Sequence, residues 1–350
     1  MTQGSHTWQE IISQPETWRA TLEDFAATQA ALDHFLAQAD FDHILVTGCG
    51  STHYLAQTTA VTLAHHTGIP VHAFPSSELW LFPGMIPRAK ALLLLISRSG
   101  MTTETLWALE RFRKVNGGPT LTVTCYPDSP LARRADWALT APAAQEQSVA
   151  QTRSFTSMFL LTLALTAVLT HDEDMPKRLH RLPDALDDLV TRSGDLPQRL
   201  GADLSIQKIF FLGGGPLYGL ANEAMLKTKE MSLSQAEAYH PLEFRHGPMS
   251  VVDEQTLIVG FISDSGLAEE LQVLKEMQKL GAHTLALVEG SSVFSNSWQP
   301  HHIVELRSGL NEWERGPLYL PLIQRMAYHR ALAKGLDPDR PNNLTAVVEL

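Results

Sequence analysis

The stretch that decides the fold is ALLLLISRSG at residues 91–100. A short, wholly apolar run that stops at a serine- and glycine-rich turn is typical of a strand buried in a parallel sheet. A helical pattern follows from about Thr102 to Val115, and another apolar run follows at residues 120–125. Strands that alternate with helices in this way predict an α/β fold, with helices covering both faces of a parallel sheet.

The same order of signals occurs twice along the chain. Residues 43–47 (HILVT) end in the turn GCGS, and residues 208–212 (KIFFL) end in GGGP. The runs SRSG and SDSG start at Ser97 and Ser263, 166 residues apart, while the glycine-rich turns end at Gly50 and Gly215, 165 residues apart. Two distinct strand-end signatures at nearly one offset predict an internal duplication.

The duplication divides the chain into predicted segments. Residues 1–38 have the apolar spacing of two helices broken near Pro15, and residues 39–170 form a first, phosphate-binding domain. Residues 171–200 are a charged, proline-containing helical linker, and residues 201–334 form a second domain with the chemical groups. Residues 335–350 are a polar tail with a short apolar end.

Composition limits the classes of partner. A net charge of −11 argues against nucleic acid, because binding to its phosphates requires clustered Lys and Arg. Two cysteines, Cys49 and Cys125, cannot form a disulfide framework. The N-terminus lacks a signal-peptide pattern, and residues 91–96 and 158–169 are too short or too interrupted to span a bilayer. We therefore expect a cytoplasmic protein with no membrane or nucleic-acid partner.

The first serine-rich turn is a candidate anion site. Ser97, Ser99 and Thr102 place hydroxyl groups around Gly100 at the start of a helix, where backbone N–H groups and a partial positive charge favour a phosphate. The alternative is a simple helix cap. The neighbouring turn at residues 48–52 favours the anion site, to which Arg98 adds charge unless it faces solvent.

Other ligand classes are poorly supported. The GCG turn lacks the third glycine of a dinucleotide fingerprint and the lysine of a P-loop, so we expect no cofactor. The 15 histidines show no recognised metal-ligand spacing, which argues against a zinc enzyme. In the second serine-rich turn, Asp264 would repel a phosphate, so this copy is predicted to have lost the anion site.

A cluster of titratable residues lies in the second half. Glu223, Lys227 and Glu230 are spaced i, i+4 and i+7 and share one helix face. A solvated salt-bridge stripe is the simpler interpretation. However, the stripe follows a strand-end turn and leads into residues 236–248, which are dense in Glu, His, Tyr and Arg. A carboxylate together with an imidazole is the usual pair for proton transfer at carbon and oxygen.

These motifs resemble the tandem sugar isomerase (SIS) family, best known from the isomerase domain of glutamine–fructose-6-phosphate aminotransferase. The resemblance covers about residue 40 to the C-terminus and implies two flavodoxin-like domains. Its carriers are the segments CGST at 49–52, SRSG at 97–100, VAQTRSFT at 149–156, KTKE at 227–230, AEAY at 236–239, EFRHGP at 243–248 and PNNL at 341–344.

The resemblance also implies roles for individual residues. Glu230 matches the base that moves a proton between C1 and C2, and His246 matches the ring-opening histidine, which that family supplies across a homodimer interface. Lys227 and Glu223 match neighbours in the same site. The implied phosphate ligands are the polar residues of three segments: Ser51, Thr52, Ser97, Arg98, Ser99, Thr102 and Gln151.

Three departures separate the chain from the aminotransferase. The tail lysine that handles the sugar carbonyl there aligns with Ala346, and a Ser-Thr-Lys motif is replaced by residues 151–153 (QTR). A glutamine-hydrolysing domain is absent from the sequence, and residue 2 is Thr2 rather than a nucleophilic cysteine. The sequence therefore favours an isomerase, deaminase or deglycase that acts on an amino-sugar or ketosamine 6-phosphate. A non-catalytic phosphosugar sensor is the alternative.

Overall fold

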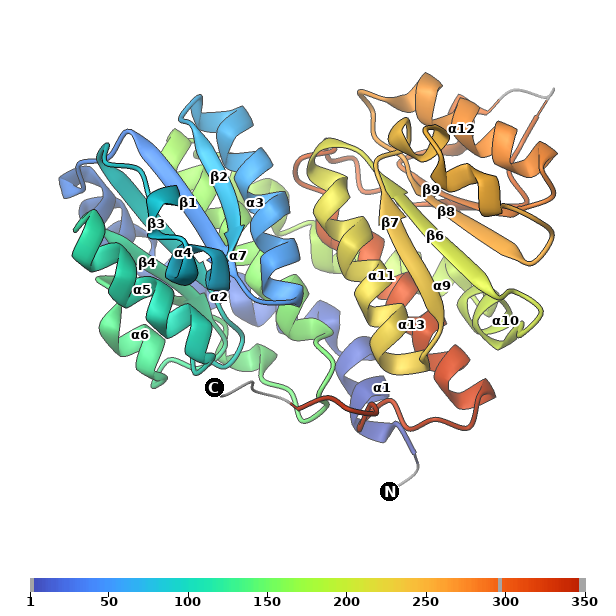
Figure 1. The fold of residues 1–350 in the computed structure, drawn as a ribbon, viewed down its shortest axis with the longest axis horizontal. Coiled ribbons are helices and arrows are strands. Elements are labelled where there is room, and N and C mark those ends of the chain that lie inside the picture. The colour runs from blue at the N-terminus through green and yellow to red at the C-terminus, as the bar shows by residue number, and fades with distance from the viewer. Residues whose placement is uncertain (1–2, 295–297, 346–350) are drawn as a thin grey trace. The chain divides into compact units, whose positions relative to one another are not determined.

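The computed structural model of the chain describes residues 3–294 and 298–345, and its internal contacts define two compact units (Figure 1). One unit consists of Ser13–Glu146, Gln151–His180 and Thr345. The other consists of the residues up to Ile12, Gln147–Ala150 and Arg181–Leu344. Each unit is built on one five-stranded parallel sheet, so we describe them separately as the first and second repeats.

The first repeat has the strand order β2-β1-β3-β4-β5. Its strands are β1 (His43–Gly48), β2 (Val71–Pro75), β3 (Ala91–Ile96), β4 (Thr120–Thr124) and β5 (Trp137–Thr140). Its helices are α2 (Gln14–Gln38), α3 (Ser51–Thr67), α4 (Ser76–Leu81), α5 (Thr103–Val115), α6 (Pro130–Arg134), α7 (Arg153–Thr170) and α8 (Met175–Leu179). All six residues of β3 are buried, because helices pack on both faces of the sheet.

The second repeat has the equivalent strand order, β7-β6-β8-β9-β10. Its strands are β6 (Lys208–Gly213), β7 (Gln235–Tyr239), β8 (Thr256–Phe261), β9 (His283–Val288) and β10 (His302–Glu305). Its helices are α1 (Ser5–Ile12), α9 (Leu182–Ser193), α10 (Leu196–Ala202), α11 (Tyr218–Ser232), α12 (Leu267–Lys279) and α13 (Tyr319–Ala333). The shared 2-1-3-4-5 order is that of flavodoxin-like folds, which confirms the predicted duplication and fold class.

The N-terminal helices belong to different repeats. Pro15 lies in the first turn of α2, where a missing N–H costs nothing, so the predicted break falls between Ile12 and Gln14. Helix α2 packs with the first repeat. Helix α1 packs in the second repeat, where the Trp8 ring packs against Tyr328 of α13 in a tilted arrangement with ring centroids 5.0 Å apart.

Helix α7 is longer than the apolar run at residues 158–169 that the sequence suggests. Its 18 residues, Arg153–Thr170, are long and apolar enough to cross a membrane by length and composition. In the structure 83% of the helix is buried inside the protein, as expected for a core helix that is apolar on every side.

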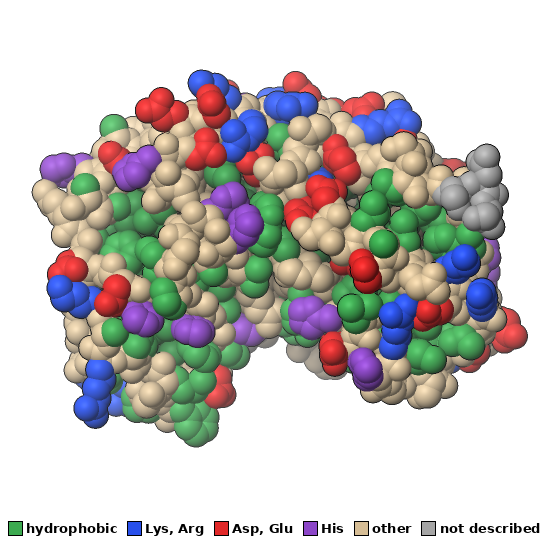
Figure 2. Space-filling view, turned by 90° about the horizontal axis from the view of Figure 1, so that it is seen from above, with side chains coloured by type: hydrophobic (Ala, Val, Ile, Leu, Met, Phe, Trp, Pro, Cys, Tyr) green, Lys and Arg blue, Asp and Glu red, His purple; other side chains and the backbone are tan. Residues whose placement is uncertain are grey.

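On the face of the molecule in Figure 2, acidic and basic side chains are interspersed over the surface.

Candidate functional site

Two strand-end turns of the first repeat build the candidate phosphate site. The turn after β1 is tight, because a Cβ on Gly48 would lie 2.6 Å from the backbone of Thr52. Gly50 has φ +56°, a conformation that favours glycine. The Thr52 hydroxyl accepts from the Cys49 N–H and donates to the Cys49 carbonyl, both at 2.9 Å. These two hydrogen bonds hold the turn in its conformation. Ser51 is buried at the start of α3.

The turn after β3 gathers the predicted hydroxyl groups. The Ser97 Oγ accepts from the Gly100 N–H at 3.1 Å and lies 3.4 Å from the Thr102 Oγ1. The Ser99 Oγ accepts from the Met101 N–H at 3.2 Å. Because Thr102 is the N-cap residue of the 13-residue helix α5, these groups lie at a helix N-terminus, as the sequence predicts.

Arg98 points into the protein rather than into solvent. Its side chain is 8% exposed, and its Nη1 lies 3.4 Å from the Glu146 carboxylate, which is fully buried. Glu146 also accepts from the N–H and the hydroxyl of Thr152, at 2.7 and 2.8 Å, and from the Ser154 N–H at 3.1 Å. This carboxylate therefore ties the serine-rich turn to the N-terminus of α7.

Gln151 directly precedes those two hydroxyl residues. Its side-chain oxygen is buried and accepts no hydrogen bond within the described part of the chain. An unsatisfied buried polar atom costs about 1–3 kcal/mol, so such an atom commonly marks a ligand position. Gln151 thus remains a candidate substrate contact.

Cys49 is a neutral thiol in this repeat. Its Sγ lies 3.6 Å from the Thr105 hydroxyl. The Thr105 hydroxyl is hydrogen-bonded to that of Ser76, which is hydrogen-bonded in turn to that of Thr47. Burial raises the pKa of the Cys49 thiol, and it raises the pKa of Cys125 further. Both cysteines are free, so neither a disulfide nor a reactive thiolate contributes to the site.

The titratable cluster of the second repeat lies on α11. The Lys227 ammonium donates to the Glu230 carboxylate and lies 3.5 Å from Glu223. The side chains of Lys227 and Glu223 are 1% and 0% exposed, and Glu230 is 18% exposed. The structure thus excludes a solvated salt-bridge stripe, because two of the three charges are buried. Glu230 is the member of the cluster that retains access to solvent.

His246 is displayed on the surface of the second repeat. Two neighbours anchor its segment: Phe244 is fully buried in the core, and Arg245 donates two hydrogen bonds of 2.8 and 2.9 Å to Glu276 of α12. The His246 imidazole itself is exposed. The chain therefore anchors the backbone immediately before this ring and leaves the ring accessible.

Pattern reasoning missed a ring pair beside this segment. His240 stacks on Tyr218, the first residue of α11, with ring centroids 3.7 Å apart and planes 19° apart. Burial lowers the pKa of His240, against the opposing effect of Glu243. Next to it, a 2.5 Å hydrogen bond to Glu237 raises the pKa of Tyr239 to about 12. A histidine directly after the AEAY motif was the only sequence signal for this pair.

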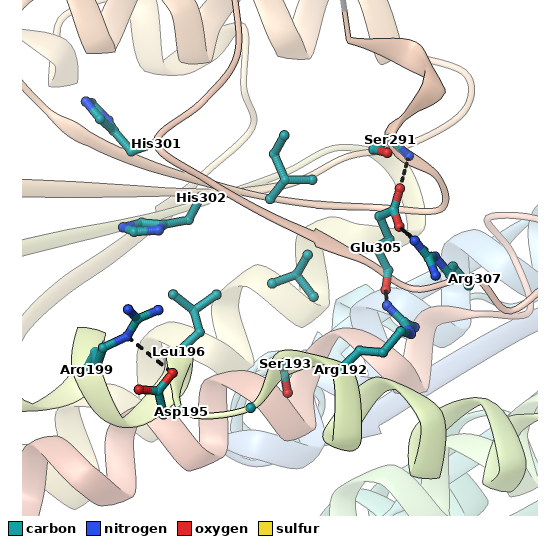
Figure 3. A pocket seen from close by; sticks show the side chains of 13 residues that line it. Arg192, Ser193, Asp195, Leu196, Arg199, Ser291, His301, His302, Glu305 and Arg307 are labelled. Atoms are coloured by element: carbon teal, nitrogen blue, oxygen red, sulfur yellow. Dashed lines mark hydrogen bonds and ion pairs between the residues drawn. The ribbon is translucent and has the colours of Figure 1, made fainter.

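The second repeat also contains a cavity of about 740 Å³ beside the edge strand β10 (Figure 3). Its charged side chains are engaged within the repeat: Arg192 with Asp188, Arg199 with Asp195, and Arg307 with Glu305. His301 and His302 also line it, but among the described residues no group of three or more His, Cys, Asp and Glu could hold a metal ion. We assign no function to this cavity.

Known proteins resemble the chain in sequence and in fold. The chain is 30% identical to the glutamine–fructose-6-phosphate aminotransferase [isomerizing] of Bordetella pertussis over 97% of its own length and 57% of the relative. The chain thus spans little more than half the length of that curated relative. Ala346, which the resemblance aligns with the aminotransferase's tail lysine, lies outside the described residues.

Two solved structures match the chain over nearly its whole length. The tagatose-6-phosphate ketose/aldose isomerase of Escherichia coli has a TM-score of 0.88 and 28% identity, covering 97% of this chain and 96% of that one. The glucosamine-6-phosphate deaminase of Thermotoga maritima has a TM-score of 0.80 and 27% identity, covering 99% and 100%. The sequence pattern that defines the SIS domain occurs twice, at residues 35–168 and 205–330. The chain therefore belongs to the SIS domain family, with two SIS domains in tandem.

Proposed function

We propose that this protein is a phosphosugar isomerase, deaminase or deglycase that acts on an amino-sugar or ketosamine 6-phosphate. The observation that carries the proposal is the buried Glu223–Lys227–Glu230 cluster, in which Glu230 alone is partly exposed. A buried ion network within a helix is costly to maintain, and perturbed charged groups of this kind cluster at functional sites.

The phosphate is assigned to the first repeat. Ser97, Ser99 and Thr102 supply hydroxyl groups at the N-terminus of α5, with Ser51 and Gln151 as further ligands. Arg98 contributes indirectly, because its guanidinium is held by Glu146. Thr52 braces its own turn, so it shapes the site through the backbone. Binding energy from a phosphate remote from the reacting carbon holds the sugar in place.

The proton transfer is assigned to Glu230. In the open-chain sugar its carboxylate removes the proton from C1 or C2 and returns it to the neighbouring carbon, through an enediol or enolamine. Lys227 holds that carboxylate by a direct hydrogen bond, and Glu223 in turn holds Lys227. A positioned acid–base group of this kind contributes roughly a hundred- to ten-thousand-fold to the rate.

Ring opening is assigned to His246. An exposed imidazole on a fixed backbone can protonate the ring oxygen of a sugar that approaches from outside its own chain. This arrangement suits a homodimer in which the partner subunit supplies the histidine side chain, as the family resemblance implies. In this proposal His246 and Glu230 act at successive steps of one reaction.

The fate of the nitrogen separates the three reactions. Hydrolysis of the imine that follows proton transfer releases ammonia or an amine and leaves a ketose or aldose phosphate, whereas an isomerase keeps every atom of the substrate. Both a deaminase and an isomerase occur among the similar solved structures. With Ala346 at the position of the aminotransferase's tail lysine, we favour the deaminase or deglycase reaction.

A substrate panel tests the proposal. The protein is incubated in D2O with amino-sugar and ketosamine 6-phosphates, and NMR follows the sugar products, the released amine and deuterium at C1 and C2. We expect one substrate class to turn over with deuterium incorporation. A compound that binds tightly while none of the panel reacts or exchanges would contradict catalysis and identify a phosphosugar sensor.

A further inference from the structure

The two repeats carry corresponding serine- and glycine-containing turns at equivalent strand ends, after β3 and after β8. In the first repeat the Gly100 N–H donates to the Ser97 Oγ at 3.1 Å. In the second repeat the Gly266 N–H donates to the Ser263 Oγ at 2.9 Å. The turns share this hydrogen bond but differ in backbone conformation, since Gly100 has φ +62° and Gly266 has φ −105°. They also differ in what their remaining polar groups bind.

In the second repeat a carboxylate of the chain occupies the turn. Glu312, 6% exposed, accepts from the backbone N–H groups of Asp264 at 2.6 Å and of Ser265 at 3.0 Å, and it also accepts from the Ser265 hydroxyl. Successive backbone N–H groups that converge on one acceptor form an anion-binding nest. Glu312 therefore stands where a bound anion would be stabilised.

A second carboxylate fills the space beside this nest. Glu270 accepts from the N–H and the hydroxyl of Ser263, at 2.7 and 2.9 Å. Its Oε1 lies 2.8 Å from the position that a Cβ on Gly266 would take and 2.9 Å from that on Gly214. Since Gly214 belongs to the turn after β6, Glu270 lies between the two strand-end turns of this repeat.

The matching carboxylate of the first repeat is directed elsewhere. Glu146 precedes Glu312 by 166 residues, the offset of the duplication, and each lies seven residues before the last long helix of its repeat, α7 or α13. Glu146 accepts from the N–H groups of Thr152 and Ser154 at the start of α7, and it reaches the serine-rich turn through the Arg98 side chain.

The ion pair at the turn is also reversed between the repeats. In the first repeat the turn supplies the cation, since Arg98 pairs with Glu146 at 3.4 Å. In the second repeat the turn supplies the anion, since Asp264 accepts from the buried Arg315 at 2.6 and 2.7 Å. Arg315 thus neutralises Asp264 and leaves Glu312 and Glu270 as the charges that face the turn.

We propose that Glu312 and Glu270 act as built-in anions that close the second repeat to phosphate esters, so that each chain binds only one. This proposal rests on the phosphate site proposed above for the first repeat. A phosphate dianion at the second turn would have to displace a bonded carboxylate and would meet a second negative charge beside it. Removing both charges exposes the Asp264 and Ser265 N–H groups and the two hydroxyl groups of the turn as a second anion site.

The test is the stoichiometry of inorganic phosphate bound to the full-length protein, measured by isothermal titration calorimetry. Wild type is expected to bind one phosphate per chain, and Glu270→Gln combined with Glu312→Ala is expected to bind two. Glu305→Gln is the matched control, because it removes a carboxylate that accepts from the Ser291 N–H in the same repeat. This control is expected to bind one.

The outcomes separate the two proposals. One phosphate on both wild type and the double variant would contradict the built-in anions alone, whereas a wild type that binds none would contradict the first-repeat site itself. The single variant Glu312→Ala keeps the test valid if the double variant is unstable. Phosphate should raise the melting temperature of this variant more than that of wild type, and an equal rise would contradict the proposal.

Discussion

Lys227 and Glu223 form a buried ion pair on α11, with 3.5 Å between Nζ and Oε1 and side-chain exposures of 1% and 0%. Removing the ammonium leaves buried carboxylate charge without compensation, which typically costs about 3–5 kcal/mol. We therefore expect Lys227→Met to lower the free energy of unfolding by about this amount, as measured by urea denaturation.

Lys177→Met is the control for that measurement, because Lys177 pairs with Asp174 on the surface. An exposed pair of this kind contributes little to stability, so this variant should unfold at the urea concentration of wild type. If Lys227→Met also unfolded there, α11 would not depend on a buried ion network, and the assignment of its carboxylates to chemistry would lose its basis.

The serine-rich turn of the first repeat tolerates no side chain at Gly100. A Cβ there would lie 2.1 Å from the Ser129 Oγ, and the residue has φ +62°. Gly100→Ala should cost at least about 2 kcal/mol and abolish phosphate binding, because the turn must move. Gly84→Ala meets no atom within 4 Å and should change neither property. Calorimetry with inorganic phosphate and thermal unfolding measure both effects, and full binding by Gly100→Ala would contradict the site.

The exposed ring of His246 allows chemical rescue. His246→Ala should lower kcat by roughly a hundred-fold or more, since an acid–base group is lost, with little effect on stability because the ring is exposed. Added imidazole should restore part of the rate. His34→Ala removes another exposed histidine, on α2, and should leave the rate unchanged. Rescue separates a catalytic role from a structural one, and a variant with wild-type kcat would remove His246 from the mechanism.

His240 should make stability depend on pH. Burial lowers its pKa below the ordinary value of 6.5 in the folded protein, so the unfolded chain binds this proton more tightly. The stabilising contribution is complete above that value and is lost as pH falls through the folded-state pKa. His240→Phe keeps the stack on Tyr218 but cannot titrate. The variant should therefore lose less free energy of unfolding than wild type between about pH 7.5 and pH 5, and equal losses would contradict the shift.

Sequence periodicity predicted the strands that are buried on both faces. Residues 91–96 form a continuous apolar run and residues 120–125 consist of apolar residues and threonine, so their place in a parallel sheet could be inferred from pattern alone. Strand β7 (QAEAY) could not, because its side chains are partly exposed at the edge of the sheet and alternate with charge. Strand β5 (WALT) was missed because it is short, only partly buried and at the edge of its sheet.

Helical spacing placed Glu223, Lys227 and Glu230 on one face, but it could not tell a solvated stripe from a buried network. That distinction depends on what packs over α11, which is tertiary information. The roles of Glu270 and Glu312 could not be predicted from the sequence pattern either. Glu312 accepts from the Asp264 N–H although the two residues are 48 positions apart in the chain. Local sequence revealed only that Asp264 is a poor neighbour for a phosphate.

The most direct test of the account measures proton exchange at C1 and C2 in D2O by NMR for wild type and Glu230→Gln, using the sugar phosphate that reacts in the panel. The amide keeps the shape of the side chain and cannot accept the proton. We predict that the variant exchanges at least roughly a hundred-fold more slowly than wild type while it binds inorganic phosphate with unchanged affinity. Exchange by Glu230→Gln at the wild-type rate would contradict the claim that Glu230 moves this proton.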